Sequence, residues 1–385
     1  MNDNCYELTA TKDYVEDWSF SNAIRELIQN GIDAEQIDPF NKFSIEYQEE
    51  NKKLLLRNEK SKLKVSSLLF GKTNKLNNDD TVGHFGEGYK VAAIILNRMG
   101  KTFTIYNNNA NEIWTSRFKN SEKWKEQILA FYVNPNVPDE SGLIFEIGNV
   151  SLAEYEELYE VYLPMYEEKY STIKEIIDTP YGEILVPCDE DDDVKGRIWV
   201  NGLAVNCYCD LEYGYNFKAK YIPLERDRKT AESWDVKRTT SKMMVNALKN
   251  GKITLEQTTA LIRESADDLS SLDYCGENIQ SLKRDLEKEF IRENNNYMNI
   301  AVPVSSEKEK KEVLKYGGQP IIVSSNMANL LSDYRNQKIN ELAESYTEDD
   351  EIPIKMQFQN WYDLYSGELG ERAKKTLSNL INKLP

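Results

Sequence analysis

The sequence contains very little histidine and cysteine. Its single histidine is His84, and its five cysteines are Cys5, Cys188, Cys207, Cys209 and Cys275. Because the cysteines are scattered and odd in number, we expect reduced thiols rather than a disulfide framework. Cys207 and Cys209 form a close pair, but neither a second pair nor the histidine lies near them in the sequence. We therefore do not expect a zinc site, which needs several such ligands.

Long apolar runs and an excess of positive charge are also missing. The chain has no apolar run of about 18 residues and no signal-peptide pattern, so we expect a cytoplasmic protein without a membrane span. The formal net charge is −17, from 48 lysines and arginines against 65 aspartates and glutamates. Such an acidic chain does not favour bulk binding of nucleic acid or anionic membrane. Residues 52–75, with eight basic residues and one acid, are either a solvated edge or a site for a polyanion.

Residues 23–34, AIRELIQNGIDA, have the pattern of an amphipathic helix. Ser19 or Ser21 is suited to cap its start, and Asp38-Pro39 is suited to end it. Apolar residues recur with helical spacing, so one stripe of this helix is expected to face a core.

The polar residues of this helix are also regularly spaced. Glu26, Asn30 and Asp33 follow the spacing i, i+4 and i+7, so their side chains lie on one face. Two carboxylates and a carboxamide are costly to bury without a partner. Gly31 in mid-helix suggests that another group packs closely there. This segment alone leaves two alternatives open, a functional polar face and an ordinary helix with a wet edge.

A second motif is rich in glycine. Residues 83–90, GHFGEGYK, precede the apolar run VAAIIL, which predicts a helix that begins at the motif. Gly83, Gly86 and Gly88 would let the backbone approach a ligand, and the N–H groups at a helix start favour phosphate. A glycine motif of this kind is weak evidence by itself.

Together, E-x-x-x-N-x-x-D-A and the later G-x-F-G-E-G-x-K resemble the GHKL ATPases, which include gyrase, the large heat-shock chaperones, histidine kinases and MutL. The resemblance implies an α+β fold of the Bergerat type, in which helices cover one face of a mixed, mostly antiparallel sheet. It also implies ATP and Mg²⁺ as cofactors. Because His84 is the only histidine, a self-contained histidine kinase with its own phosphoacceptor is not expected.

The resemblance assigns roles to matching residues. Glu26 matches the general base that activates water, and Asn30 matches the residue that holds Mg²⁺ against the phosphates. Phosphoryl transfer needs such positioning and charge neutralisation. The remaining matched positions, expected to bind the nucleotide, are Asp33, Ala34, Gly83, His84, Phe85, Gly86, Glu87, Gly88 and Lys90.

One box of the family is missing. Where D-x-G-x-G should follow a strand and read the adenine, residues 53–63 are KLLLRNEKSKL. Asn58 is the best substitute by position, since its carbonyl oxygen can accept from an adenine amine. Residues 69–75, LFGKTNK, resemble the lead into the lid of MutL-like members, so Lys75 either reaches a phosphate or is a solvated lysine.

Farther along, residues 196–206, GRIWVNGLAVN, resemble the entry of the second, transducer-like domain of this superfamily. In such proteins a basic residue of that domain commonly contacts the γ-phosphate. Arg226, Arg228 and Lys229 are the candidates, because a guanidinium suits phosphate well. The alternative is a cluster of salt bridges between domains.

We expect an ATP-binding domain at residues 1–150, a transducer-like α/β domain at 151–250, and a mostly helical α/β region at 251–385. The last region shows no catalytic constellation and is expected to support a homodimer or bind a protein partner. Residues 1–17 are a polar arm that either packs locally or crosses to a partner. Three functions remain open: a Mg²⁺-dependent ATPase switch, a nucleotide sensor with little turnover, and an acidic interaction protein on a relic scaffold.

Overall fold

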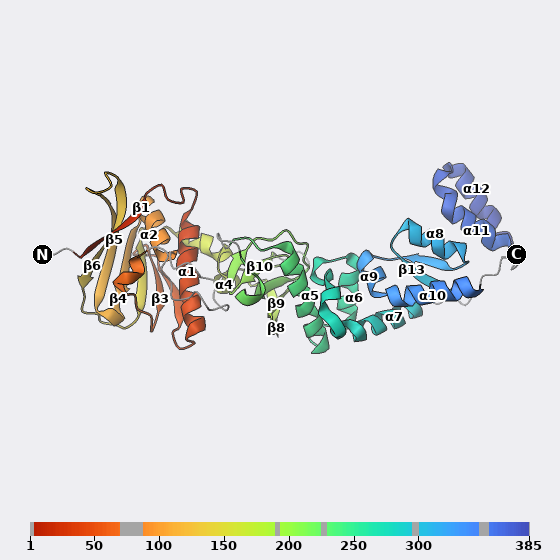
Figure 1. The fold of residues 1–385 in the computed structure, drawn as a ribbon, viewed down its shortest axis with the longest axis horizontal. Coiled ribbons are helices and arrows are strands. Elements are labelled where there is room, and N and C mark those ends of the chain that lie inside the picture. Colours follow the sequence, from red (N-terminus) through yellow and green to blue (C-terminus); the bar gives the residue numbers. More distant parts are fainter. Residues whose placement is uncertain are drawn as a thin grey trace. The chain divides into compact units, whose positions relative to one another are not determined.

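The computed structural model describes residues 4–69, 88–188, 193–224, 229–294, 300–345 and 354–384. The chain divides into two compact units, Met1–Thr239 and Thr240–Pro385. Figure 1 shows two sheets in the first unit and a largely helical second unit.

The first sheet has seven strands in the order β1-β6-β5-β4-β7-β3-β2, and every pairing between them is antiparallel. Its strands are β1 (Cys5–Thr11), β2 (Phe43–Gln48), β3 (Lys53–Asn58), β4 (Thr102–Asn107), β5 (Glu112–Asn120), β6 (Gln127–Pro135) and β7 (Leu143–Gly148). The sequence pattern predicts strands at residues 43–47, 54–56, 102–106, 112–118, 128–133 and 142–147, and these match β2 to β7. The expected polar arm contains β1, which pairs with β6, so these residues pack locally.

Helices α1 (Phe20–Ile37) and α2 (Gly88–Arg98) pack against this sheet (Figure 1). Their fully buried Leu27 and Ile95 share one hydrophobic core with Leu54 and Ile105 of the strands. The connecting short 3-10 helices are η1 (Val65–Leu68) and η2 (Asn108–Ala110). The predicted layer of helices on an antiparallel sheet is confirmed.

The predicted ends of α1 are also confirmed. The hydroxyl of Ser19 accepts from the Asn22 N–H at 3.4 Å. At the other end, the Asp38 N–H donates to the Ala34 carbonyl at 3.2 Å. These bonds satisfy groups that a helix otherwise leaves unpaired at its ends.

The second sheet of the first unit has five strands in the order β11-β10-β12-β9-β8. They are β8 (Ile173–Thr179), β9 (Gly182–Pro187), β10 (Ile198–Val200), β11 (Leu203–Val205) and β12 (Gly214–Phe217). The helical segments around it are α3 (Leu152–Glu156), η3 (Glu157–Glu160), α4 (Leu163–Tyr170) and η4 (Ala219–Tyr221), followed by α5 (Ser233–Lys249). The sequence pattern predicts strands at residues 182–187 and within residues 196–206, which match β9, β10 and β11, but it does not predict β8 or β12.

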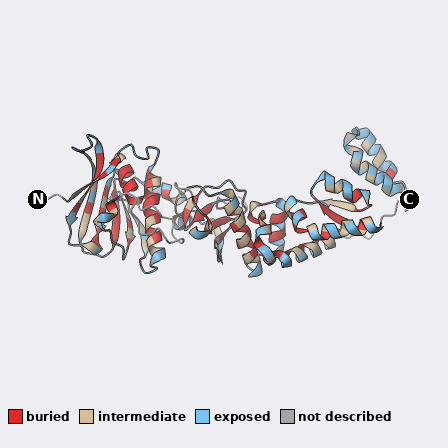
Figure 2. Cartoon of the chain, in the orientation of Figure 1, coloured by how far each residue is buried: buried red, intermediate tan, exposed pale blue. Residues whose placement is uncertain are grey.

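The second unit contains a β-α-β unit within a set of helices. Its parallel strands β13 (Ala301–Val304) and β14 (Gln319–Ile322) flank α8 (Glu307–Lys315), as predicted. The other elements are α6 (Leu255–Glu264), η5 (Asp267–Leu269), η6 (Leu272–Ile279), α7 (Gln280–Asn294), α9 (Ser325–Leu330), α10 (Ser332–Ser345), α11 (Ile354–Tyr365), η7 (Ser366–Glu368) and α12 (Glu371–Ile381). Figure 2 shows α11 and α12 largely exposed. The α+β fold class is confirmed in both units. Among the described residues, no helix is long and apolar enough to cross a membrane.

Candidate functional site

The polar face of α1 lies inside the first unit rather than at its surface. Glu26 is 7% exposed and Asp33 is fully buried, while Asn30 between them is half-buried. The opposite side of the helix packs on the sheet, where the ring of Phe43 lies so close to Gly31 that a Cβ there would come within 2.2 Å of it. The close packing that Gly31 suggested is therefore present, and it holds α1 with its polar face turned away from the sheet.

The structure brings the two sequence motifs together at Gly88, the first residue of α2. A Cβ at position 88 would lie 2.8 Å from both Glu26 Oε2 and Asn30 Nδ2. The carboxylate and the carboxamide therefore converge on the backbone of the last glycine in the glycine-rich motif. A side chain at position 88 would therefore force the Glu26 carboxylate and the Asn30 carboxamide to shift.

The donor set fits a hard divalent cation such as Mg²⁺. Carboxylate and carboxamide oxygens are suitable ligands, and Mg²⁺ usually takes only one or two protein oxygens beside substrate phosphates and water. Rotating the Asn30 carboxamide by half a turn would present Oδ1 in place of Nδ2. In the part of the chain that the structure describes, no group of three or more Asp, Glu, His or Cys side chains could hold a metal ion, at this site or at any other.

Asn58, the predicted reader of adenine, is buried at the end of β3. Its Nδ2 donates to the carbonyls of Gly31, at 3.0 Å, and Asn41, at 3.3 Å. Both amide hydrogens are thus used within the protein, which fixes the carboxamide and leaves Oδ1 as its other polar atom. Through its bond to the Gly31 carbonyl, Asn58 also contacts α1 directly. Gly31 precedes Asp33 by two residues. Adenine recognition by Asn58 stays a prediction.

Lys90 and Tyr89 anchor the start of α2 to the segment around η1. The fully buried Lys90 Nζ donates to the carbonyls of Ser67, at 3.0 Å, and Leu69, at 2.7 Å. The Tyr89 hydroxyl lies 2.8 Å from Ser67 Oγ. Burial raises the pKa of Tyr89 well above its usual value, an effect that the bond with Ser67 reduces only in part. These contacts tie the start of α2 to Ser67 and Leu69, and a role of Lys90 toward a phosphate stays a prediction.

Several predicted residues lie outside the described residues. They are Lys75, Gly83, His84, Phe85, Gly86 and Glu87 in segment 70–87, and Arg226 and Arg228 in segment 225–228. Their predicted roles remain predictions. Ala34, which is described, is half-buried near the end of α1.

The segment 225–228 is bracketed by described contacts within the first unit. Leu224 and Ala231 form an antiparallel bridge, and Asn206 bridges to Thr230. The next basic residue, Lys229, places its Nζ 4.9 Å from the ring centre of Trp18, which precedes α1. Lys229, which borders this segment, therefore lies near the start of α1, the helix that carries Glu26.

The sequence analysis missed Arg25, which links α1 to the second sheet. Arg25 is 6% exposed, and its Nη1 donates to the carbonyl of Ala204 in β11 at 2.6 Å. Nothing in the local sequence indicates this bond, because its partners are 179 positions apart. The contact joins the residue next to Glu26 to the strand that leads into Asn206.

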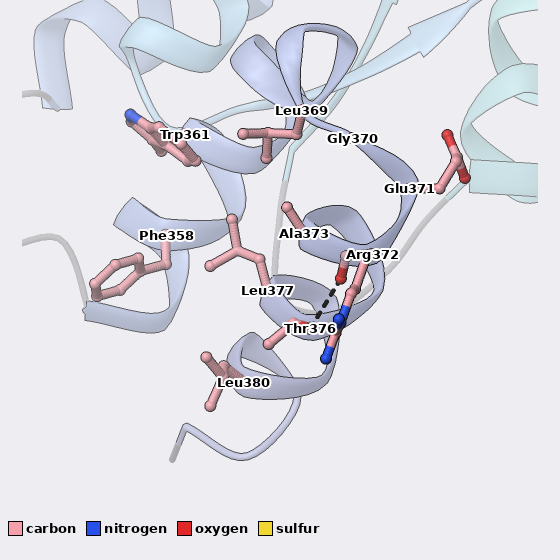
Figure 3. A pocket seen from close by; sticks show the side chains of 10 residues that line it. All are labelled: Phe358, Trp361, Leu369, Gly370, Glu371, Arg372, Ala373, Thr376, Leu377 and Leu380. Carbon is pink, nitrogen blue, oxygen red and sulfur yellow. Dashed lines mark hydrogen bonds between the residues drawn. The ribbon is translucent and has the colours of Figure 1, made fainter.

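A different kind of hollow occurs in the second unit. A groove with a volume of about 930 Å³ lies along α11 and α12. Figure 3 shows its lining, mainly the apolar side chains of Phe358, Trp361, Ala373, Leu377 and Leu380. Its apolar lining lacks the clustered carboxylates and carboxamides seen on α1, so we do not place phosphoryl chemistry there.

Comparisons with known proteins give only distant similarities. No family model matches the chain. A Mycoplasma pneumoniae protein named only as uncharacterized is 23% identical over 226 residues, which make up 57% of this chain and 88% of that protein.

Among solved structures, the ATPase region of Saccharomyces cerevisiae topoisomerase II is similar over 55% of this chain and 77% of its own, with 12% identity and a TM-score of 0.36. The ATPase and transducer domains of Balamuthia mandrillaris DNA topoisomerase II are similar over 48% of this chain and 59% of theirs, with 12% identity and a TM-score of 0.32. At these values the two similarities carry no argument about function, and the site is argued from its own residues.

Proposed function

We propose that this chain is a Mg²⁺-dependent, ATP-hydrolysing conformational switch of the GHKL type. The observation that carries the proposal is the convergence of Glu26 and Asn30 on Gly88, with 2.8 Å from each side chain to a Cβ built there. The residues proposed as general base and metal ligand thus lie beside the backbone of one glycine, although they come from motifs more than 50 residues apart.

In this proposal, Glu26 accepts a proton from the water that attacks the γ-phosphate, and Asn30 holds Mg²⁺ through its carbonyl oxygen. The bound cation neutralises phosphate charge. Backbone N–H groups of Gly83, Gly86 and Gly88 bind phosphate oxygens at the start of α2. Lys75, His84, Phe85, Glu87 and Lys90 belong to the same lid and cradle, and Asp33, Ala34 and Asn58 face the nucleoside.

Coupling to the second sheet is proposed to run through contacts that flank the site. Arg228 or Arg226 contacts the γ-phosphate, and Lys229 on Trp18 supports the approach of this segment to α1. The buried bond from Arg25 to Ala204 supports a rigid connection between the catalytic helix and β11. Loss of turnover in Arg226→Ala or Arg228→Ala, with ATP binding retained, is the expected result.

A nucleotide sensor with little turnover is the second candidate. The absence of the D-x-G-x-G box favours it. A homodimer or protein partner, bound through residues 251–385, and a cytoplasmic location belong to both candidates. The relic scaffold is less favoured, because a relic has no need to keep both Asn30 and the close approach of Gly88.

The experiment is equilibrium binding of ATP in the presence and absence of Mg²⁺, on the wild type and Asn30→Ala. We expect Mg²⁺ to tighten ATP binding in the wild type at least tenfold and to have little effect in the variant. Equal Mg²⁺ dependence in both proteins would contradict the metal role of Asn30. Binding without any turnover in the wild type would favour the sensor.

A further inference from the structure

Gln29 on α1 is a buried polar side chain without a partner. It is 1% exposed, and neither its Nε2 nor its Oε1 has a hydrogen-bond partner. Of the described residues with buried side-chain polar atoms that lack a partner, Gln29 alone lacks one at two atoms. Buried polar atoms in native proteins are almost always hydrogen-bonded, and an orphaned one calls for an explanation such as a ligand or a water.

The buried, unpartnered carboxamide of Gln29 lowers the stability of the folded protein, so its presence calls for an explanation. A buried donor or acceptor that is left unsatisfied destabilises the folded protein, because it loses its hydrogen bonds with water and gains none within the protein. Methionine or leucine would fill the same space on α1 without that cost. A carboxamide at this position is therefore unfavourable for the fold by itself, and we look for its role in what the fold binds.

The place of Gln29 on α1 supplies that role. It follows Glu26 by three residues and precedes Asp33 by four, so the three side chains lie along one face of the helix. Glu26 in turn faces the backbone of Gly88. The unpartnered carboxamide thus lies within one helical turn of the proposed general base.

We propose that Gln29 is a positioning residue that orients the attacking water beside Glu26. This inference rests on the proposed function. A water that attacks phosphorus must keep one lone pair free, so its two hydrogens need two acceptors. Glu26 and Gln29 Oε1 supply those acceptors, and Gln29 Nε2 remains to donate to a phosphate oxygen, as a glutamine does for the attacking water in some GTPases.

The step balances with these groups. The water oxygen forms a bond to the γ-phosphorus while its proton passes to Glu26. The bond from that phosphorus to the bridging oxygen breaks, and its electron pair leaves with ADP. Gln29 neither gains nor loses a proton, so its contribution is orientation alone.

The test uses Gln29→Met, with Gln48→Met as the matched control. Gln48 is half-buried in β2 and bonded to Glu46 at 2.8 Å, away from α1. We expect Gln29→Met to raise the melting temperature of the nucleotide-free protein by about 2–6 °C, because an unsatisfied buried group is removed. We expect its kcat to fall about tenfold or more, with the dissociation constant of Mg²⁺-ATP unchanged within about twofold. Gln48→Met should leave the melting temperature, the kcat and the dissociation constant of Mg²⁺-ATP nearly unchanged.

A variant with wild-type kcat would overturn the proposal. A variant in which kcat and the melting temperature both fall would also overturn it, since Gln29 would then be a structural residue. A variant with a lower affinity for Mg²⁺-ATP but an unchanged kcat would overturn it as well. Turnover and Mg²⁺-ATP binding are measured first on the wild type. Absence of both there means that the proposed function has failed, which is a different result from a wild-type ATPase that tolerates Gln29→Met.

Discussion

Helices α1 and α12 depart from the usual arrangement of side chains in opposite ways. In α1, Glu26, Gln29 and Asp33 are at most 7% exposed, although all three are polar. Along α12 and its neighbour α11, apolar side chains remain open, with Leu380 54% exposed and Trp361 44% exposed. Buried polar groups and clustered exposed apolar groups are the informative exceptions in a folded protein. The comparison is consistent with the polar ligand proposed at α1 and favours the proposal that α12 contacts a partner through apolar side chains.

The largest effect should come from filling the space between α1 and α2. In Gly88→Ala the new Cβ would meet Glu26 and Asn30 at 2.8 Å, so both side chains must move from the cation and the phosphates. We expect the affinity for Mg²⁺-ATP to fall at least tenfold, measured by calorimetric titration. Gly367→Ala is the control, because a Cβ there meets nothing within 4 Å. Equal affinities for wild type and Gly88→Ala would show that the nucleotide does not depend on this approach.

A change on α12 should leave the fold intact and act on association. Leu380→Lys places a charge on a side chain that is 54% exposed, so the free energy of unfolding should change by less than about 0.5 kcal/mol. If the groove of Figure 3 contacts a second copy, the dimer should weaken about tenfold or more, as measured by sedimentation velocity with Mg²⁺-ATP present. A wild type that stays monomeric in this assay would exclude the homodimer, and a protein partner would remain.

The smallest effect concerns the anchor of α2. The Tyr89 pKa is raised in the folded protein, so its stabilising contribution is complete below about pH 10 and is lost as the pH rises further. At pH 8, Tyr89→Phe should cost about 1 kcal/mol, because the bond to Ser67 is gone. By pH 11 this deficit should shrink, since the variant lacks the ionising group. Urea unfolding of the wild type and the variant at both pH values measures this difference in the free energy of unfolding. A difference that stays constant between the two pH values would contradict the raised pKa of Tyr89.

The sequence predicted α1 well because its signals are local. Ser19, Asp38 and the spacing of Glu26, Asn30 and Asp33 lie within about 20 residues, and helical geometry alone puts the three polar groups on one face. Strand β8 was missed because it is an edge strand in which Ile177 and Thr179 are the only buried residues, so its pattern is weak.

The rest of the site depends on packing that no local pattern encodes. The approach of Gly88 to α1 joins residues far apart in the chain, and only the resemblance of the motifs suggested it. The bond between Arg25 and Ala204 depends on how two sheets of the first unit meet. The orphaned carboxamide of Gln29 is visible only when every neighbour is in place, since its sequence position on α1 looks like that of any polar helix residue.

The most direct test of the account is ATP binding and turnover with Mg²⁺, measured on the wild type and on Glu26→Ala. The account predicts that both proteins bind Mg²⁺-ATP with similar affinity, and that kcat falls about 100-fold or more in the variant, because the proton acceptor is lost. If Glu26→Ala hydrolyses ATP at the wild-type rate, or if the wild type binds no ATP, the proposed role of the polar face of α1 is contradicted.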